Sequence, residues 1–77
     1  MVDYKVIGLR LKTYRQQAGL TQETVAERAG ITVAYLSKIE NGHVRPTIDL
    51  LQTVCEAVHC DLGSIFQDAS PVSAGYQ

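Results

Sequence analysis

Residues 21–40, TQETVAERAGITVAYLSKIE, contain the pattern that sets the fold of this 77-residue chain. Thr21 is a good N-cap for a helix over residues 22–29, and Gly30 ends that helix because glycine adopts the left-handed conformation without strain. Thr32 then caps a second helix, so the stretch predicts two short helices joined by a tight turn. Their expected inward residues are apolar or small: Val25, Ala26, Ala29, Ile31, Leu36 and Ile39.

Three more helices are expected around this unit. The first covers residues 6–18, where an apolar stripe of helical period ends at Gly19. The fourth runs from residue 48 to about 59 behind the cap Thr47, and the fifth covers residues 62–66. The stripe of the first helix consists of Ile7, Leu11, Tyr14 and Ala18, and the basic residues beside it, Arg10, Lys12 and Arg15, are expected in solvent.

The fold class predicted from this pattern is all-α, because the chain shows no strand-like alternation. Five helices would form one compact domain over residues 6–66, since 77 residues leave no room for a second one. Residues 67–77, QDASPVSAGYQ, are rich in small residues and are expected to form a flexible tail or a dimer arm. A domain this small gains stability from dimerisation.

Charge is distributed unevenly along the chain. The formal net charge is −1, which argues against a generic polyanion binder. Residues 1–20 carry a net charge of +3, whereas residues 46–77 carry −4 and contain no lysine or arginine. This polarity suits a protein with one face toward phosphate, although ordinary solvated surfaces would produce it too.

Several functional classes lack support in the sequence. No apolar run approaches the roughly 18–20 residues that cross a bilayer, and the N-terminus has no signal peptide, so a cytoplasmic protein without membrane contact is expected. The sequence contains no set of residues typical of nucleophilic catalysis and no glycine-rich phosphate loop. We therefore expect a protein that is not an enzyme and binds no cofactor. Cys55 and Cys60 are expected on different helix faces as free, buried or half-buried thiols, and His59 beside them does not complete a four-ligand metal site.

Two helices joined by a turn of about three residues form a helix-turn-helix. Once the apolar positions of its second helix, Thr32–Glu40, face inward, the outward positions are fixed. They are Thr32, Val33, Ala34, Tyr35, Ser37 and Lys38. This arrangement fits a helix whose N-terminal end contacts base edges in the major groove while the preceding helix crosses the DNA backbone.

Residues 19–42, GLTQETVAERAGITVAYLSKIENG, resemble the phage-repressor type of helix-turn-helix, which is Cro/cI-like and also called the XRE family. The likeness continues through residues 45–66, RPTIDLLQTVCEAVHCDLGSIF, and so covers nearly all of the expected domain. It implies a compact five-helix, lambda-repressor-like DNA-binding domain in a bacterial or phage transcription regulator. The partner implied is double-stranded DNA.

The resemblance also implies roles for individual residues. Base edges would be contacted by Thr32, Val33, Ala34, Ser37 and Lys38. Backbone phosphates would be contacted by Gln22, Tyr35, Asn41, His43 and Arg45. Arg15 and Glu40 would form a structural ion pair. Lys38 can donate to guanine, whereas Val33 and Ala34 can only pack on a thymine methyl group, so DNA shape is expected to carry much of the specificity.

Other interpretations remain open at this point. The outward face of the second helix could contact a protein, Gln22 could be only a good helix former, and Arg15–Glu40 could be a surface ion pair worth at most about 1 kcal/mol. The leading hypothesis is a sequence-specific repressor that binds a two-fold operator as a homodimer, with half-sites about 34 Å apart. The alternatives are an antitoxin-like module with a protein partner and a restriction-modification controller-type activator. The dimer surface is expected on the fourth and fifth helices with the tail residues Val72 and Tyr76.

Overall fold

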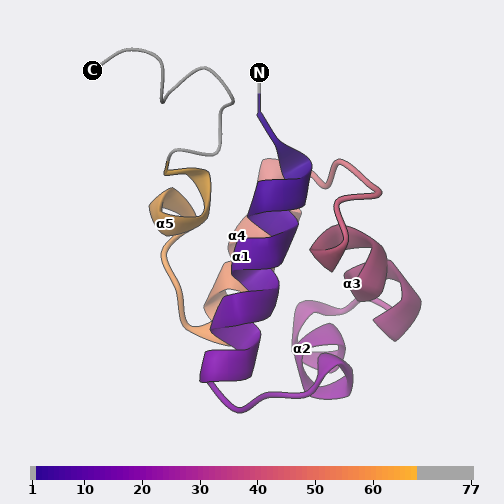
Figure 1. Cartoon of the computed structure of the whole chain (residues 1–77). Helices are drawn as coiled ribbons and strands as arrows, with labels where there is room; N and C mark the ends of the chain where they lie inside the picture. The colour runs from indigo at the N-terminus through magenta and orange to yellow at the C-terminus, as the bar shows by residue number, and fades with distance from the viewer. Residues whose placement is uncertain (1, 68–77) are drawn as a thin grey trace.

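The computed structural model describes residues 2–67, and this part of the chain is built from five helices without any strand (Figure 1). Their bounds are α1 Tyr4–Gln17, α2 Gln22–Ala29, α3 Val33–Glu40, α4 Ile48–Val58 and α5 Leu62–Phe66. The all-α fold class is therefore confirmed. The prediction of a tail or dimer arm falls, apart from Gln67, outside the described residues.

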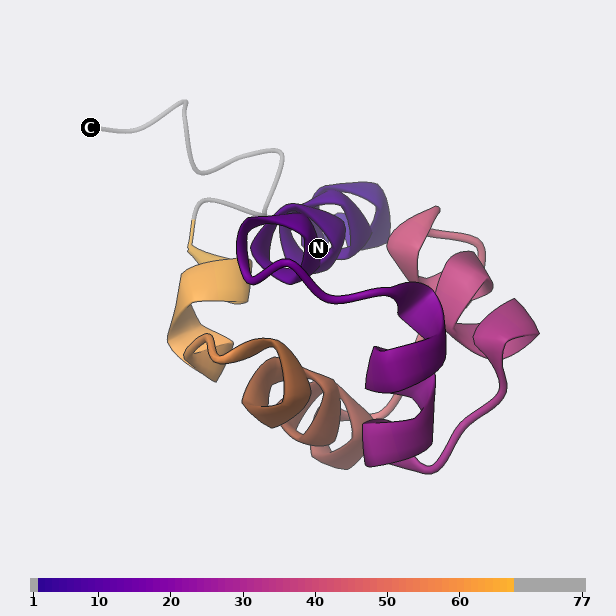
Figure 2. The same cartoon turned by 90° about the horizontal axis from the view of Figure 1, so that it is seen from below.

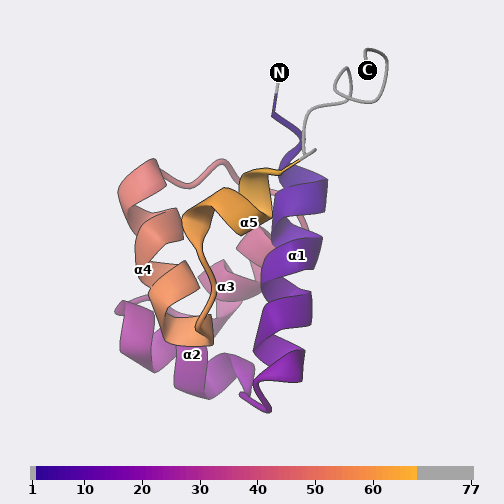
Figure 3. The ribbon, with the colours of Figure 1, turned by 90° about the vertical axis from the view of Figure 1, so that its left-hand side faces the viewer.

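The helices surround a single apolar core. α1 and α4 lie on opposite sides of the domain with α5 between them, and α2 and α3 lie together on the side away from α5 (Figures 2 and 3). Every helix contributes side chains that are at most 2% exposed: Ile7, Leu11, Val25, Ala26, Leu36, Ile39, Leu51, Val54, Cys55, Val58 and Ile65. This shared core fixes α3 relative to the other four helices.

The ends of α1 differ from the prediction. The helix begins at Tyr4, two residues earlier than expected, because the Asp3 carboxylate accepts a hydrogen bond from the amide of Lys5 at 3.0 Å. It ends at Gln17, so Ala18 becomes the C-cap and is exposed rather than inward-facing. The apolar stripe alone could not locate a capping residue that precedes it.

Arg10 is half-buried and its side chain is hydrogen-bonded, although the basic residues of α1 were expected in solvent. Its guanidinium donates to the carbonyl of Ile65 at 3.2 Å and also to the carbonyl of Gln67. Both acceptors lie at the C-terminal end of α5, where a short helix leaves carbonyl groups without intrahelical partners. Arg10 therefore ties α5 to α1.

The C-terminal turn of α4 brings the two cysteines together. His59 has a left-handed backbone with φ 63°, and the amide of Cys60 donates to the carbonyl of Cys55 at 2.9 Å. This turn reverses the chain after α4 and returns the backbone of Cys60 to Cys55. Both cysteines are free, one buried and one half-buried, as predicted.

Burial raises the pKa of the Cys55 thiol from the ordinary 9.0 to about 12, with the hydrogen bond to Cys60 adding to the shift. We expect iodoacetamide at pH 8 to modify the half-buried Cys60 before Cys55, which should react only after unfolding in urea. Because the folded pKa is the higher one, the stabilisation by the neutral thiol is complete below pH 9 and is lost as the pH rises toward 12. Mass spectrometry of the alkylated peptides measures the order in which the two thiols react with iodoacetamide. Equal labelling of both thiols in the native protein would contradict the expected order.

Candidate nucleic-acid interface

The two-helix unit is capped as the sequence predicts. The Thr21 hydroxyl accepts from the amide of Thr24 at 3.1 Å, and the Thr32 hydroxyl accepts from the amide of Tyr35 at 3.0 Å. Gly30 ends α2 in the left-handed conformation with φ 73°. These local interactions fix where α2 ends and α3 begins, and they set the angle at which α3 leaves the turn.

α3 separates a buried side from an exposed one. Leu36 and Ile39 are 1% and 2% exposed, whereas Val33 is 37% exposed. The candidate base-contacting residues occupy the exposed side: Thr32, Val33, Ala34 and Lys38 are exposed, and Ser37 is half-buried. Tyr35, a phosphate candidate, is half-buried and packs against the core. Four of the six positions expected to face outward are thus exposed, whereas Ser37 is half-buried and Tyr35 packs against the core.

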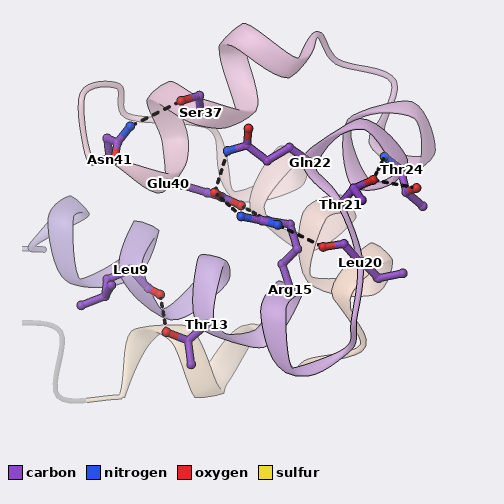
Figure 4. Close-up of polar contacts among 10 residues, drawn as sticks. All are labelled: Leu9, Thr13, Arg15, Leu20, Thr21, Gln22, Thr24, Ser37, Glu40 and Asn41. Carbon is purple, nitrogen blue, oxygen red and sulfur yellow. Dashed lines mark hydrogen bonds and ion pairs between the residues drawn. The ribbon is translucent and has the colours of Figure 1, made fainter.

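The segment after α3 carries three more phosphate candidates. Asn41, His43 and Arg45 are all exposed. The Asn41 side-chain amide donates to the Ser37 hydroxyl at 3.4 Å, which links a phosphate candidate to a base candidate (Figure 4). This loop and the outward side of α3 are joined without a break, so the structure brings the two sets of candidates together.

Arg15, Glu40 and Gln22 form one hydrogen-bonded network between α1, α2 and α3 (Figure 4). The Arg15 guanidinium donates to both carboxylate oxygens of Glu40, at 2.7 and 3.2 Å, and also to the carbonyl of Leu20 at 3.0 Å. The side chains of the ion pair are only 10% and 3% exposed. The expectation that Arg15 lies in solvent, and the alternative of a surface ion pair, are therefore wrong.

Gln22 completes this network from the first residue of α2. Its Nε2 donates to Glu40 Oε1 at 2.9 Å, which holds the carboxamide beside the N-terminus of the helix. An amide nitrogen has two N–H donors, so one stays available for another acceptor. Sequence reasoning treated Gln22 and the Arg15–Glu40 pair separately, whereas the structure joins all three.

Gly8 is a structurally decisive residue that the sequence analysis did not single out. A methyl group placed there would lie 2.2 Å from the carbonyl oxygen of Ile39 and 2.6 Å from that of Glu40. Only glycine therefore allows α1 to pack directly on the last turn of α3. A glycine inside an otherwise regular helical pattern was the available signal.

Other kinds of site receive no support from the described part of the chain. Residues 2–67 include no group of three or more His, Cys, Asp or Glu side chains placed to hold a metal ion. None of the helices formed by these residues combines the length and the apolar character needed to cross a membrane. Their buried side-chain polar atoms all have hydrogen-bond partners, so the core presents no unpaired group to a ligand.

Known proteins share this sequence pattern and this fold. The model of the family HTH_3, described as helix-turn-helix, matches residues 11–65. The transcriptional regulator ClgR of Mycobacterium tuberculosis is 34% identical over 65 residues, which are 84% of this chain and 58% of that protein. The chain thus spans little more than half the length of this relative.

Solved structures give the same picture. The clp gene regulator ClgR from C. glutamicum superposes with a TM-score of 0.82 at 26% identity, covering 90% of both chains. The restriction-modification controller protein C.AhdI from Aeromonas hydrophila superposes with a TM-score of 0.78, also at 26% identity. That likeness covers 83% of this chain and 97% of the controller protein.

Proposed function

Because the chain belongs to the helix-turn-helix family HTH_3, of the XRE type, we propose that it is a transcriptional regulator that binds DNA by placing α3 in the major groove. The observation that carries this proposal is the division of α3 into a side locked in the core and a side left exposed. The buried network of Arg15, Glu40 and Gln22 supports it, because a rigid α1–α2–α3 unit presents the exposed side in one orientation.

Base readout is assigned to the exposed side of α3. Lys38 is exposed and can donate to O6 or N7 of guanine. Val33 and Ala34 can pack only on thymine methyl groups, so they favour A·T pairs without a directional contact. Thr32 and Ser37 flank these three positions. With a single charged donor on this side, sequence-dependent DNA shape supplies the rest of the specificity.

Backbone phosphates are assigned to residues around the edge of that surface. Gln22 donates its second amide N–H, and its hydrogen bond to Glu40 orients it for the purpose. The other phosphate ligands are Tyr35, Asn41, His43 and Arg45. Because the net charge is only −1 and each subunit makes few such contacts, tight binding requires two subunits on one site. The protein therefore acts as a homodimer on a two-fold operator, as a repressor that occupies the promoter.

The dimer surface expected on α4 and α5 can be tested only at a residue that lies outside the core of one subunit. Ile65 of α5 is 0% exposed, so a charge introduced there would test the core of one subunit rather than contact between two. Phe66 is half-buried and can reach a partner, whereas Val72 and Tyr76 lie outside the described residues. Sedimentation of a Phe66→Glu variant is the appropriate test of a dimer that uses α5.

Activation instead of repression is the second candidate. The likeness to a restriction-modification controller protein extends over 97% of that chain, so nearly the whole fold of that protein is matched. Both candidates use the same DNA-binding surface and differ in where the operator lies relative to the promoter. A promoter–reporter assay with and without the protein distinguishes them by the sign of the change.

Two substitutions test the proposed roles of Lys38 in reading bases and of Gln22 in binding phosphate. After selection of a preferred site from random DNA, Lys38→Ala should lose about 1–3 kcal/mol at the preferred sequence and much less elsewhere. Gln22→Ala should weaken binding to all sequences by a similar factor, because a phosphate carries no base identity. Fluorescence anisotropy on preferred and scrambled duplexes measures both. Uniform weakening by Lys38→Ala would refute its base-reading role, and no sequence-dependent binding by the wild-type protein would refute the function.

A further inference from the structure

An open hollow of about 470 Å³ lies beside the C-terminal end of α3. It is lined by residues 2–5, which include the first turn of α1, and by residues 42–45, which follow α3. The hollow belongs neither to the outward side of α3 nor to the network around Glu40. Two of its lining residues, His43 and Arg45, are already assigned to phosphate contacts, whereas Lys5 has no assigned role.

Gly42 explains why these two segments meet. It has φ 74°, and a methyl group there would lie 2.7 Å from the Cα of Lys5, so the backbone of α1 packs directly on this turn. The following amide, that of His43, donates to the carbonyl of Lys38 at 2.9 Å and closes the end of α3. The hollow is thus a fixed product of how α3 ends against α1.

The side chains around the hollow favour an anion. Lys5 and Arg45 are exposed cations that come from the two different segments. The Arg45 guanidinium lies 6.0 Å from the centre of the Tyr4 ring, which restricts where it points. The opposing carboxylate, Asp3, accepts hydrogen bonds from the amides of Lys5 and Val6 at 3.0 and 3.4 Å and is occupied in capping α1.

We propose that this hollow binds a backbone phosphate of the same DNA duplex, outside the base pairs that α3 reads, with Lys5 and Arg45 as its charged ligands. The proposal rests on the proposed function. When the N-terminal end of α3 faces the bases, its C-terminal end and the following loop are directed toward the sugar-phosphate edge of the groove. A phosphodiester oxygen there accepts charge-assisted hydrogen bonds from a lysine and an arginine. Lys5 thereby extends the interface from the helix-turn-helix to α1.

Salt dependence provides the test. Anisotropy titrations of the full chain on its selected duplex between about 50 and 200 mM salt give the slope of log K against log salt. Lys5→Gln should reduce that slope by about 1, as expected for one lost phosphate contact. Lys12→Gln is the matched control, because it removes the same charge two turns further along the same face of α1, outside the hollow. The control should leave the slope unchanged.

A modified duplex locates the contact. Methylphosphonate linkages that neutralise the phosphates flanking the selected site should weaken the wild-type protein and Lys12→Gln equally. Lys5→Gln should be weakened less, because only the Arg45 contact to that phosphate remains to be lost. Equal slopes for Lys5→Gln and Lys12→Gln, on DNA that the wild type binds, would overturn this proposal and leave the proposed function intact. Failure of the wild-type protein to bind any duplex would overturn both.

Discussion

Replacing Arg15 with methionine is expected to lower the free energy of unfolding by about 3–5 kcal/mol. The reason is the partner that remains, because the Glu40 side chain is 3% exposed and would become a buried carboxylate with no opposite charge. Gln22 would be its one remaining side-chain donor, through a single amide N–H at 2.9 Å. A loss of this size is a large part of the roughly 5–15 kcal/mol that stabilises an ordinary domain. Urea unfolding followed by circular dichroism measures it.

A double substitution, Arg15→Met with Glu40→Leu, separates burial of a charge from packing. Replacing both members of a buried pair by apolar side chains is often close to neutral, so most of the lost stability should return. Binding to DNA should nevertheless stay weaker than in the wild type, because Gln22 has lost the carboxylate that orients it. A single Arg15→Met variant that costs less than about 1 kcal/mol would mean that the pair behaves like an exposed ion pair.

Local signals explain which parts of the fold could be predicted. The bounds of α2 and α5 match the expectation, and Thr32 caps α3 as predicted, because capping residues and glycines act within one turn of themselves. The start of α1 was placed too late because only its apolar stripe was read. Arg15 was expected in solvent because the helical pattern assigns polar side chains to the exposed side. Its partner, Glu40, lies far along the chain, so the ion pair was predicted only from the family resemblance and not from the helical pattern.

In the candidate site, too, local patterns predicted the exposure of single residues but not the contacts between helices. Exposure of Val33, Ala34 and Lys38 follows from the period of α3 and could be predicted. The hydrogen bond between Gln22 and Glu40 could not, because it depends on where the ends of two helices meet. The hollow beside α3 likewise depends on the contact between α1 and Gly42. The period of α3 therefore predicted the exposure of these three residues, whereas tertiary packing buried Arg15 against the expectation and decided which residues act together.

Gly8→Ala is expected to destabilise the protein by about 3 kcal/mol, at the upper end of what overpacking costs. The added methyl group would lie 2.2 Å from the carbonyl oxygen of Ile39, which is far inside van der Waals contact. That oxygen belongs to the backbone, so no rotamer change can relieve the overlap and α1 must move away from α3. Alanine is the better helix former by roughly 0.5–1 kcal/mol, but this gain is too small to offset the displacement.

Gly63→Ala supplies the matched control for this substitution. Gly63 is also helical, but a methyl group there would meet nothing within 4 Å, so the same change should be neutral or slightly stabilising. The two variants differ only in whether α1 and α3 are forced apart. Gly8→Ala should also bind DNA more weakly at temperatures where circular dichroism still finds it folded, because the displaced end of α3 carries Glu40 and hence the anchor of Gln22. Equal stability of the two variants would show that α1 does not hold α3 at this distance, and the orientation of the recognition surface would then need another cause.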